Sequence, residues 1–353
     1  MYSTRQIEIP YLLKIGPGKI AKVGKYLFDK GMTKIALFAG EGIEELVGPQ
    51  LNKSLNEWGI EALHRQTVSG VDIESITQTA FFLPSVNAIV GIGGGKALDF
   101  AKYAAHLLKI PFVSIPTAIS NDGFSSPSSS LTVAGKRKSV KSGTPFGVVI
   151  DLDIIKRSSD IFLYSGIGDT LSKITALKDW QMARDKGLDR FVDFAAVLAY
   201  NSLDILFLMH SFDIHSERFQ RSLASSLTMS GLAMEIAGSS RPASGSEHLI
   251  SHALDSISAS PKMHGIQVGV ATYLCALLQK NEHAVGIATV FQKTGFWDYV
   301  KQDPFDYAEF IQAVKLAPTI KNDYYTILSE PDTFKMADEY IKQDEFLKLV
   351  IKI

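Results

Sequence analysis

The sequence predicts a parallel α/β domain followed by an all-helical domain, and three observations support this. Before about residue 160, short apolar runs alternate with segments of helical periodicity. Such alternation is typical of a doubly wound parallel sheet. After residue 160, β-branched runs become rare and long amphipathic segments follow one another. The length of 353 residues suits two domains, which we expect at residues 1–160 and 161–353.

The apolar pattern predicts each element in turn. In the first domain we expect strands at residues 34–39, 87–92, 111–115 and 146–150, and helices at residues 42–58 and 97–108. Residues 131–133 and 139–140 flank a Gly-Lys-Arg turn and predict a hairpin near one edge of the sheet. In the second domain we expect helices at residues 169–183, 191–212, 216–237, 246–256 and 265–279. Ser246 is the expected N-cap of the helix at 246–256.

Composition and charge exclude several classes of protein. The formal net charge of -1 argues against a nucleic-acid partner or an anionic membrane partner. No apolar run approaches the roughly 18 residues that span a bilayer, and the N-terminus lacks a signal-peptide pattern. We therefore expect a cytoplasmic protein. The single cysteine, Cys275, excludes an intrachain disulfide, and its apolar helical setting predicts a buried, inert thiol.

A run of glycines, Gly91 to Gly95, follows one predicted strand and opens the next helix. Glycines let a ligand approach the backbone, and a helix N-terminus offers free N–H groups to a phosphate. The spacing matches neither G-x-G-x-x-G nor a P-loop, so a tight turn without a ligand is the alternative. The next strand leads into a second polar loop, residues 116–123. Because ligands of open α/β sheets bind at the carboxyl ends of strands, we expect a nucleotide there. For Asp122 the alternative is a simple turn carboxylate.

Three residues that are far apart in the sequence, Asp169, His248 and His264, each lie in a stretch that contains glycine, serine or proline. One carboxylate and two imidazoles are a common ligand set for a catalytic divalent metal that keeps a position open for substrate. His252 follows His248 by four residues and shares its helix face. The alternative is that each residue is structural, with Asp169 and Thr170 at a helix entry.

Together these motifs resemble the superfamily of iron-containing alcohol dehydrogenases, glycerol dehydrogenases and dehydroquinate synthase. The resemblance covers nearly the whole chain and rests on Ile15-Gly16-Pro17-Gly18, Gly91 to Asp99, Pro116-Thr117-Ala118, Asn121-Asp122-Gly123, Gly168-Asp169, His248 and His264. Within it, the loop that continues through Ser125-Ser126-Pro127 is most similar to the glycerol-1-phosphate dehydrogenase family. Glycerol dehydrogenases usually carry Ala-Pro at Gly123-Phe124. Asn121 departs from the His, Thr or Met that these families commonly carry.

The resemblance implies a dehydroquinate synthase-like fold: an N-terminal nucleotide-binding domain, a helical metal- and substrate-binding domain, and an active site in the cleft. It implies that Asp169, His248 and His264 bind one divalent metal, usually Zn²⁺, with Ni²⁺ or Fe²⁺ as the other options. It implies substrate contacts from Asp122, Asp169 and His252, of which Asp122 and His252 are the catalytic candidates. It implies NAD or NADP contacts from Gly93, Gly94, Gly95, Lys96, Ala97, Leu98, Asp99, Thr117, Ala118, Ile119, Ser120 and Ser126.

The reaction implied is the interconversion of dihydroxyacetone phosphate and sn-glycerol 1-phosphate. The alternatives are oxidation of glycerol or another small polyol, a lyase like dehydroquinate synthase, and a non-catalytic nucleotide-binding relative. The lyase needs a denser set of Lys and Arg than the sequence shows, and the intact metal set argues against the non-catalytic relative.

The chain offers two candidates for binding a substrate phosphate, which needs cationic donors. One is the basic hairpin, Lys136-Arg137-Lys138 with Lys141, for which a solvated tip is the alternative, and the other is Arg241. Glu41 follows a strand end and would repel a 2′-phosphate near the ribose, which favours NAD over NADP. We expect a homo-oligomer, since this is common among soluble enzymes.

Overall fold

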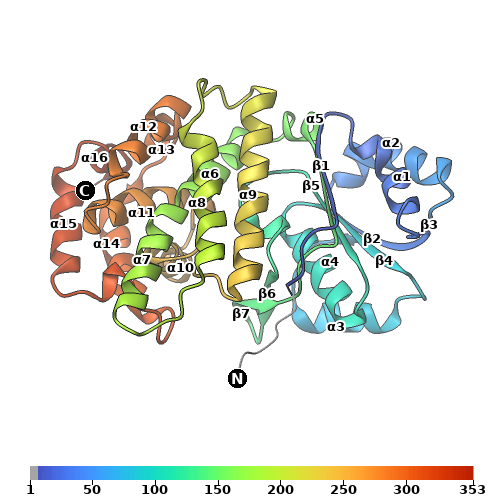
Figure 1. Ribbon diagram of the computed structural model, residues 1–353, viewed down its shortest axis with the longest axis horizontal. Coiled ribbons are helices and arrows are strands. Elements are labelled where there is room, and N and C mark those ends of the chain that lie inside the picture. Colours follow the sequence, from blue (N-terminus) through green and yellow to red (C-terminus); the bar gives the residue numbers. More distant parts are fainter. Residues whose placement is uncertain (1–6, 353) are drawn as a thin grey trace. The chain divides into compact units, whose positions relative to one another are not determined.

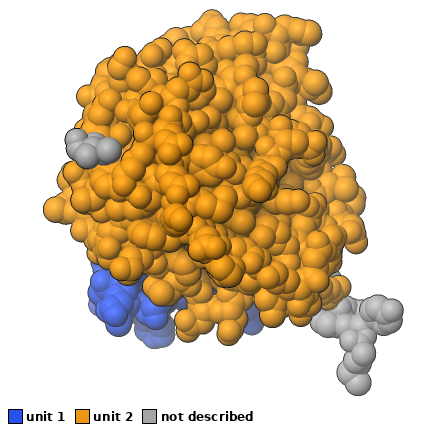
Figure 2. Space-filling model, turned by 90° about the vertical axis from the view of Figure 1, so that its left-hand side faces the viewer, with its two compact units in different colours: residues 1–158 blue, residues 159–353 orange. Residues whose placement is uncertain are grey.

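The computed structural model describes residues 7–352, and the chain forms two units, Met1–Ser158 and Ser159–Ile353 (Figure 2). The first unit is α/β and the second is almost entirely helical (Figure 1). This confirms the predicted fold class.

A six-stranded sheet in the order β1-β8-β5-β4-β2-β3 forms the centre of the first unit, and every pair in it is parallel. Its strands are β1 Leu12–Gly16, β2 Lys34–Gly40, β3 Glu61–Val68, β4 Ala88–Gly93, β5 Phe112–Pro116 and β8 Gly147–Asp151. The four predicted strands are the four inner ones. Both edge strands, β1 and β3, were missed, and β3 shows why: most of its side chains are exposed or half-buried, so its sequence lacks an apolar run.

Helices cover both faces of this sheet. They are α1 Val23–Phe28, α2 Ile43–Glu57, α3 Ile73–Phe82, α4 Gly95–Leu108 and the short α5 Leu152–Ile155. The side chains of α1 and α2 pack with Ile35, Leu37 and Ala39 of β2 in one core cluster. The other face of β2 packs on α4, where the rings of Phe38 and Phe100 lie 5.1 Å apart. The arrangement is the doubly wound one that the alternating pattern predicts.

The predicted hairpin is present, but it forms a sheet of its own. Strands β6 Ser128–Val133 and β7 Lys136–Lys141 pair antiparallel and join no strand of the large sheet. Most side chains of β7 are exposed.

The second unit consists of helices α6 Asp160–Leu171, α7 Lys173–Asp185, α8 Asp193–Phe207, α9 Glu217–Ala237, α10 Ser246–Ile257, α11 His264–Leu278, α12 Ala284–Thr294, α13 Phe296–Gln302, α14 Tyr307–Leu316, α15 Thr333–Gln343 and α16 Leu347–Val350, with the short parallel strands β9 Phe305–Asp306 and β10 Ile351–Lys352. Two expectations are corrected. The helix expected at residues 169–183 is two helices that break at Ser172, so Asp169 lies in the last turn of α6 and not at a helix entry. Ser246 is the first residue of α10 and Gly245 is its N-cap; the backbone N–H of Ser246 donates to a buried carboxylate, Asp179 Oδ2, at 2.7 Å.

Helix α11 lies inside the second unit, with nearly all of its residues buried. A helix that is apolar on all sides must be surrounded by other elements, and α6, α7, α10, α12, α15 and α16 all contact it. Cys275 is buried in α11, as expected. Between residues 7 and 352, no helix is long and apolar enough to cross a membrane.

Candidate active site

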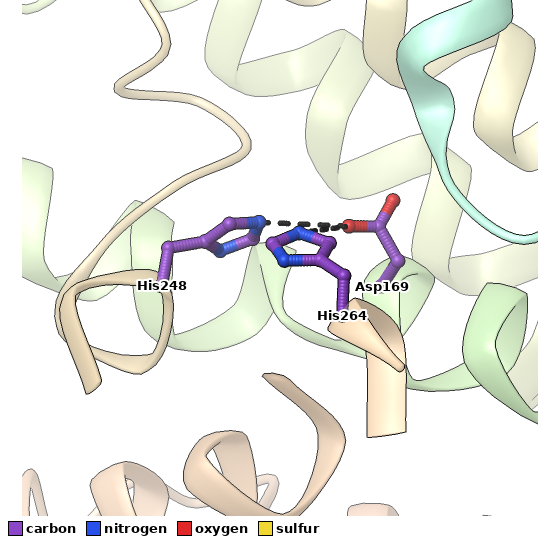
Figure 3. Close-up of side chains that lie close together, drawn as sticks. All are labelled: Asp169, His248 and His264. Atoms are coloured by element: carbon purple, nitrogen blue, oxygen red, sulfur yellow. Dashed lines mark ion pairs between the residues drawn. The ribbon is translucent and has the colours of Figure 1, made fainter. Parts of the chain in front are cut away.

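The second unit brings Asp169, His248 and His264 together. Asp169 comes from the end of α6, His248 from the first turn of α10, and His264 is the first residue of α11. One ligand atom from each lies within 4.8 Å of the other two. Both imidazole Nε2 atoms face a single oxygen, Asp169 Oδ1, at 3.5 Å for His248 and 4.0 Å for His264 (Figure 3). The convergence that the sequence left open is therefore present within one unit.

Two glycines explain how α6 and α11 approach closely enough to join Asp169 and His264. A Cβ on Gly168 would overlap the carbonyl oxygen of Gly265, and a Cβ on Gly265 would overlap that of Ser165. The Gly265 N–H also donates to Ser165 Oγ at 3.1 Å. Each glycine is adjacent in sequence to one ligand, so this helix contact fixes the separation of Asp169 and His264.

A buried carboxylate determines which nitrogen of His248 faces the site. Glu247 Oε1 accepts from His248 Nδ1 at 2.9 Å, and Glu247 Oε2 accepts from the Thr175 hydroxyl at 2.7 Å. Because the carboxylate only accepts, Nδ1 carries hydrogen, and Nε2 is the nitrogen left to bind a metal.

A chain of hydrogen bonds from Gln267 through Ser251 determines which ring nitrogen of His264 carries hydrogen. The Gln267 side-chain NH₂ donates to the Lys262 carbonyl at 2.9 Å and to Asp255 Oδ1 at 3.2 Å, so its oxygen is the acceptor. The Ser251 hydroxyl donates its one hydrogen to that oxygen at 2.7 Å. Ser251 Oγ must then accept from His264 Nδ1, 3.2 Å away. This again leaves Nε2 of His264, the nitrogen that faces Asp169, without hydrogen and able to bind a metal.

Replacing Ser251 with alanine is expected to lower the affinity for a divalent metal by about 10- to 100-fold, the usual effect of removing an outer partner of a ligand. The ring of His264 would lose its fixed tautomer, while the helix keeps its backbone. Chelator competition measures the affinity, and ¹⁵N chemical shifts of the imidazoles in the metal-free protein report the tautomer directly.

A matched control is Ser256→Ala on the same helix, where the hydroxyl donates to the Ala253 carbonyl at 2.7 Å. Wild-type metal affinity and an unchanged Nδ1–H tautomer in Ser251→Ala would rule out this chain of hydrogen bonds.

The charges around the group favour an ionised carboxylate. Burial would raise the pKa of Asp169, but Lys173, His248 and His264 outweigh it and hold the pKa well below its usual value. Lys173, fully buried, donates to Asp169 Oδ2 at 3.2 Å and to the Asp169 carbonyl at 2.6 Å. One carboxylate oxygen is thereby held by the lysine and the other faces the two imidazoles.

The two imidazoles differ in their readiness to lose a proton. Burial, followed by the neighbouring His248, lowers the pKa of His264 to about 4. Burial would also lower the pKa of His248, but its hydrogen bonds with Asp169 and Glu247 outweigh it and the pKa lies above its usual value. A metal therefore competes with a proton mainly at His248.

His252 lies beside the group without joining it. Its ring centroid is 6.0 Å from that of His264 and 6.4 Å from that of His248. Burial, then the two neighbouring histidines and Lys321, lower its pKa well below the usual value. His252 is therefore a neighbour of the three converging residues and not a member of their group.

In the first unit, the two predicted nucleotide loops lie side by side. Gly93 pairs with Pro116 at the ends of β4 and β5, and the Thr117 N–H donates to the Gly93 carbonyl at 3.1 Å. Gly93 has φ 141°, and a Cβ there would lie 3.1 Å from the backbone nitrogen of Gly40, so only glycine fits. Gly94 and Gly95 are exposed, and a Cβ on either would meet no other part of the unit within 4 Å, so a ligand can approach the backbone at the start of α4.

A buried lysine holds the Asp122 loop in place. Lys102 of α4 donates to the carbonyls of Gly123 and Ser128, both at 2.7 Å, and lies 3.6 Å from Asp99 Oδ1. Asn121, the residue that departs from the family pattern, accepts from the Gly123 N–H at 2.9 Å and caps the short 3₁₀ turn Asp122–Phe124.

The other predicted cofactor residues differ in what they present. Ala97, Leu98 and Ile119 are buried and can offer only backbone, and the Ser126 hydroxyl donates to the Ser128 carbonyl at 3.0 Å. Lys96 is exposed. Asp122 and these loops belong to the first unit, and the histidines to the second.

Sequence reasoning missed the residues that orient the ligands, namely Lys173, Glu247, Ser251 and Gln267. Two had a local signal: Glu247 precedes His248, and Lys173 follows Asp169 by four residues, the spacing of a helical ion pair. Ser251 and Gln267 reach His264 through a contact between α10 and α11, which no spacing in the sequence reveals.

Residues 14–158 match the family model described as iron-containing alcohol dehydrogenase. A glycerol-1-phosphate dehydrogenase (NAD(P)+) of Metallosphaera sedula is 33% identical, with 96% of this chain and 97% of the relative covered. One from Cenarchaeum symbiosum is 34% identical, with 92% of each covered. The chain belongs to the glycerol-1-phosphate dehydrogenase family. Among solved structures, glycerol dehydrogenase of Schizosaccharomyces pombe has the same fold, with a TM-score of 0.77, 21% identity, and 97% of this chain and 92% of that chain covered.

Proposed function

We propose that this protein is a metal-dependent, NAD(P)-linked oxidoreductase that interconverts dihydroxyacetone phosphate and sn-glycerol 1-phosphate. The observation that carries the proposal is the group of Asp169, His248 and His264, in a chain whose relatives are named for this activity. NAD or NADP and a divalent metal are the cofactors.

The donor set fits a borderline divalent ion. Metal–ligand bonds of about 2.0–2.2 Å place two donors of one ion roughly 3–4 Å apart, and the Nε2–Oδ1 distances here are 3.5 and 4.0 Å. Two imidazoles with one carboxylate suit Zn²⁺, Fe²⁺ or Ni²⁺ better than Mg²⁺ or Ca²⁺, which prefer all-oxygen sites. We propose Zn²⁺ as the ion.

Bound there, a divalent ion supplies a Lewis acid that polarises the oxygen on substrate C2 and lowers the pKa of its hydroxyl. The chain's own residues orient and protect this chemistry. Lys173, Glu247 and Ser251 hold the three ligands in fixed rotamers and tautomers, so little reorganisation is needed when substrate binds. His252 is placed to hydrogen-bond a hydroxyl next to the reacting carbon, and we propose Asp122 as the second such group.

The glycine turn of the first unit suits the pyrophosphate of the cofactor. Its open N–H groups stand at the N-terminus of a 14-residue helix, where the helix dipole favours an anion. Glu41 directly follows β2, the strand that pairs with β4. A carboxylate at this strand end disfavours a 2′-phosphate, so we propose NAD as the preferred form.

The second candidate is oxidation of glycerol or another small polyol, which the fold of the yeast glycerol dehydrogenase favours. The two candidates differ in one group, the phosphate. The same metal set serves both reactions, because the reacting secondary alcohol is common to them.

Steady-state oxidation of NADH and NADPH with dihydroxyacetone phosphate and with dihydroxyacetone tests the proposal, before and after chelation. We expect kcat/KM about 100-fold higher for the phosphate, since charge-assisted hydrogen bonds each contribute about 1.5–3 kcal/mol. Chelation is expected to abolish turnover and Zn²⁺ to restore it. Equal or better rates with dihydroxyacetone would support the second candidate, oxidation of glycerol or another small polyol. No net cofactor oxidation would leave the lyase or the non-catalytic relative.

A further inference from the structure

Two cations share one aromatic ring in the second unit. Arg241, in the loop before α10, is only 2% exposed, and Lys321 follows the 3₁₀ turn Ala317–Thr319. The guanidinium carbon of Arg241 lies 3.6 Å from the ring centroid of Tyr324, and Lys321 Nζ lies 4.4 Å from it. The Tyr324 hydroxyl donates to the Ser244 carbonyl at 2.5 Å, which fixes the ring.

The hydrogen bonds of Arg241 are incomplete. Its Nε donates to Asp189 Oδ2 at 2.5 Å and its Nη1 to the Tyr325 carbonyl at 2.8 Å. Its buried Nη2 has no hydrogen-bond partner in residues 7–352. A buried guanidinium nitrogen without an acceptor is costly, so this atom indicates a missing acceptor.

Lys321 adds a second positive charge with little compensation. Its Nζ reaches Ser240 Oγ at 3.4 Å, a weak hydrogen bond. Burial, followed by the charge of Arg241, lowers the pKa of Lys321 to about 8, so the ammonium form still predominates at neutral pH. Asp189, which is partly exposed, pairs with Arg241 alone, and Glu247 has the smallest of the three effects on the pKa of Lys321, so an anion that bridges the two cations would be stabilised.

The cations lie close to the metal group. The loop that carries Arg241 leads directly into α10, which bears His248 and His252. Helix α10 also contacts the 3₁₀ turn Ala317–Thr319 that Lys321 follows, and His252 of this helix lies beside His264. The segments that carry the two cations therefore adjoin the helix that bears His248 and His252.

We propose that Arg241 and Lys321 form the subsite for the phosphate of the substrate, with Arg241 Nη2 and Lys321 Nζ as donors. The inference rests on the proposed function, because it requires a phosphorylated substrate. Guanidinium and ammonium groups are the standard phosphate donors of proteins. The other basic candidate, the hairpin strand β7, exposes Lys136, Arg137 and Lys138 to solvent and offers no such buried donor.

The test uses Lys321→Met, which removes the charge and keeps the stem, and Arg241→Lys, which keeps the charge and removes the guanidinium fork. Lys138→Met on the hairpin is the matched control, and it also tests the rival cations. We expect kcat/KM for dihydroxyacetone phosphate to fall about 10- to 100-fold in the first two variants. The value for dihydroxyacetone should change less than about twofold, and Lys138→Met should leave both values unchanged.

Inorganic phosphate gives a second measurement that needs no phosphorylated substrate. Its inhibition constant against dihydroxyacetone reduction is expected to rise about tenfold or more in Lys321→Met, while metal content and circular dichroism match the wild type. Variants that keep the wild-type preference for phosphate would overturn the subsite, as would loss of that preference in Lys138→Met alone. A wild-type enzyme that does not distinguish the two ketones would instead overturn the proposed function itself, and the subsite with it.

Discussion

His264→Ala is expected to abolish turnover and to remove the bound divalent metal, while the protein still folds. The ring supplies one of three candidate ligand atoms, two imidazole nitrogens and one carboxylate oxygen, which lie within 4.8 Å of one another. Its side chain is 31% exposed, so its loss leaves a solvent-accessible gap and no buried cavity. A bound metal stabilises the transition state by several kcal/mol, so its loss should lower the rate at least about a thousandfold. Metal analysis, circular dichroism and steady-state kinetics on one preparation measure all three properties.

The matched control is His215→Ala in the same unit, which removes a histidine that is 60% exposed and forms an ion pair with Asp160. It should retain wild-type metal content and activity. A His264→Ala protein that turns over normally without metal would contradict the account.

Gly265→Ala is expected to have the second large effect, through the backbone. Its Cβ would overlap the carbonyl of Ser165, and backbone cannot give way as a flexible side chain can. Helices α6 and α11 must separate, which costs about 3 kcal/mol of unfolding free energy or more. The same separation pulls His264 away from Asp169, so metal affinity should fall together with stability. Urea unfolding and chelator competition measure the two effects.

The matched control is Gly48→Ala, also at a buried helical glycine. There the nearest atom to a built Cβ lies 3.9 Å away. Alanine has the higher helix propensity, but a Cβ before Pro49 is disfavoured in a helix, so the two effects offset each other and stability should change by less than about 1 kcal/mol. Equal stability and metal affinity in Gly265→Ala and the wild type would show that the glycine contact does not set the site.

The inner sheet was predictable because buried parallel strands are short apolar runs, as at Ala88–Gly93. The edge strand Glu61–Val68 was not, since exposure lets polar residues occupy it. The break at Ser172 was missed as well, because the residues on both sides of it have a helical pattern.

The ligand group was predictable as residue types, but its geometry was not. Gly168 and Gly265 stand next to Asp169 and His264 because two helices meet there, and the sequence shows only the adjacency. Ser251 and Gln267 orient His264 from positions that suit ordinary helix residues. Arg241 was visible as a candidate, whereas Lys321 joins it only through the ring of Tyr324.

The central claim is that Asp169, His248 and His264 hold the metal on which turnover depends. Anomalous diffraction at the Zn absorption edge, from crystals of catalytically active, Zn²⁺-loaded protein, tests it most directly. We predict one strong peak within bonding distance of Asp169 Oδ1 and of Nε2 of both histidines. An active protein whose anomalous peak lies away from these three atoms, or that shows no peak at all, would contradict the account.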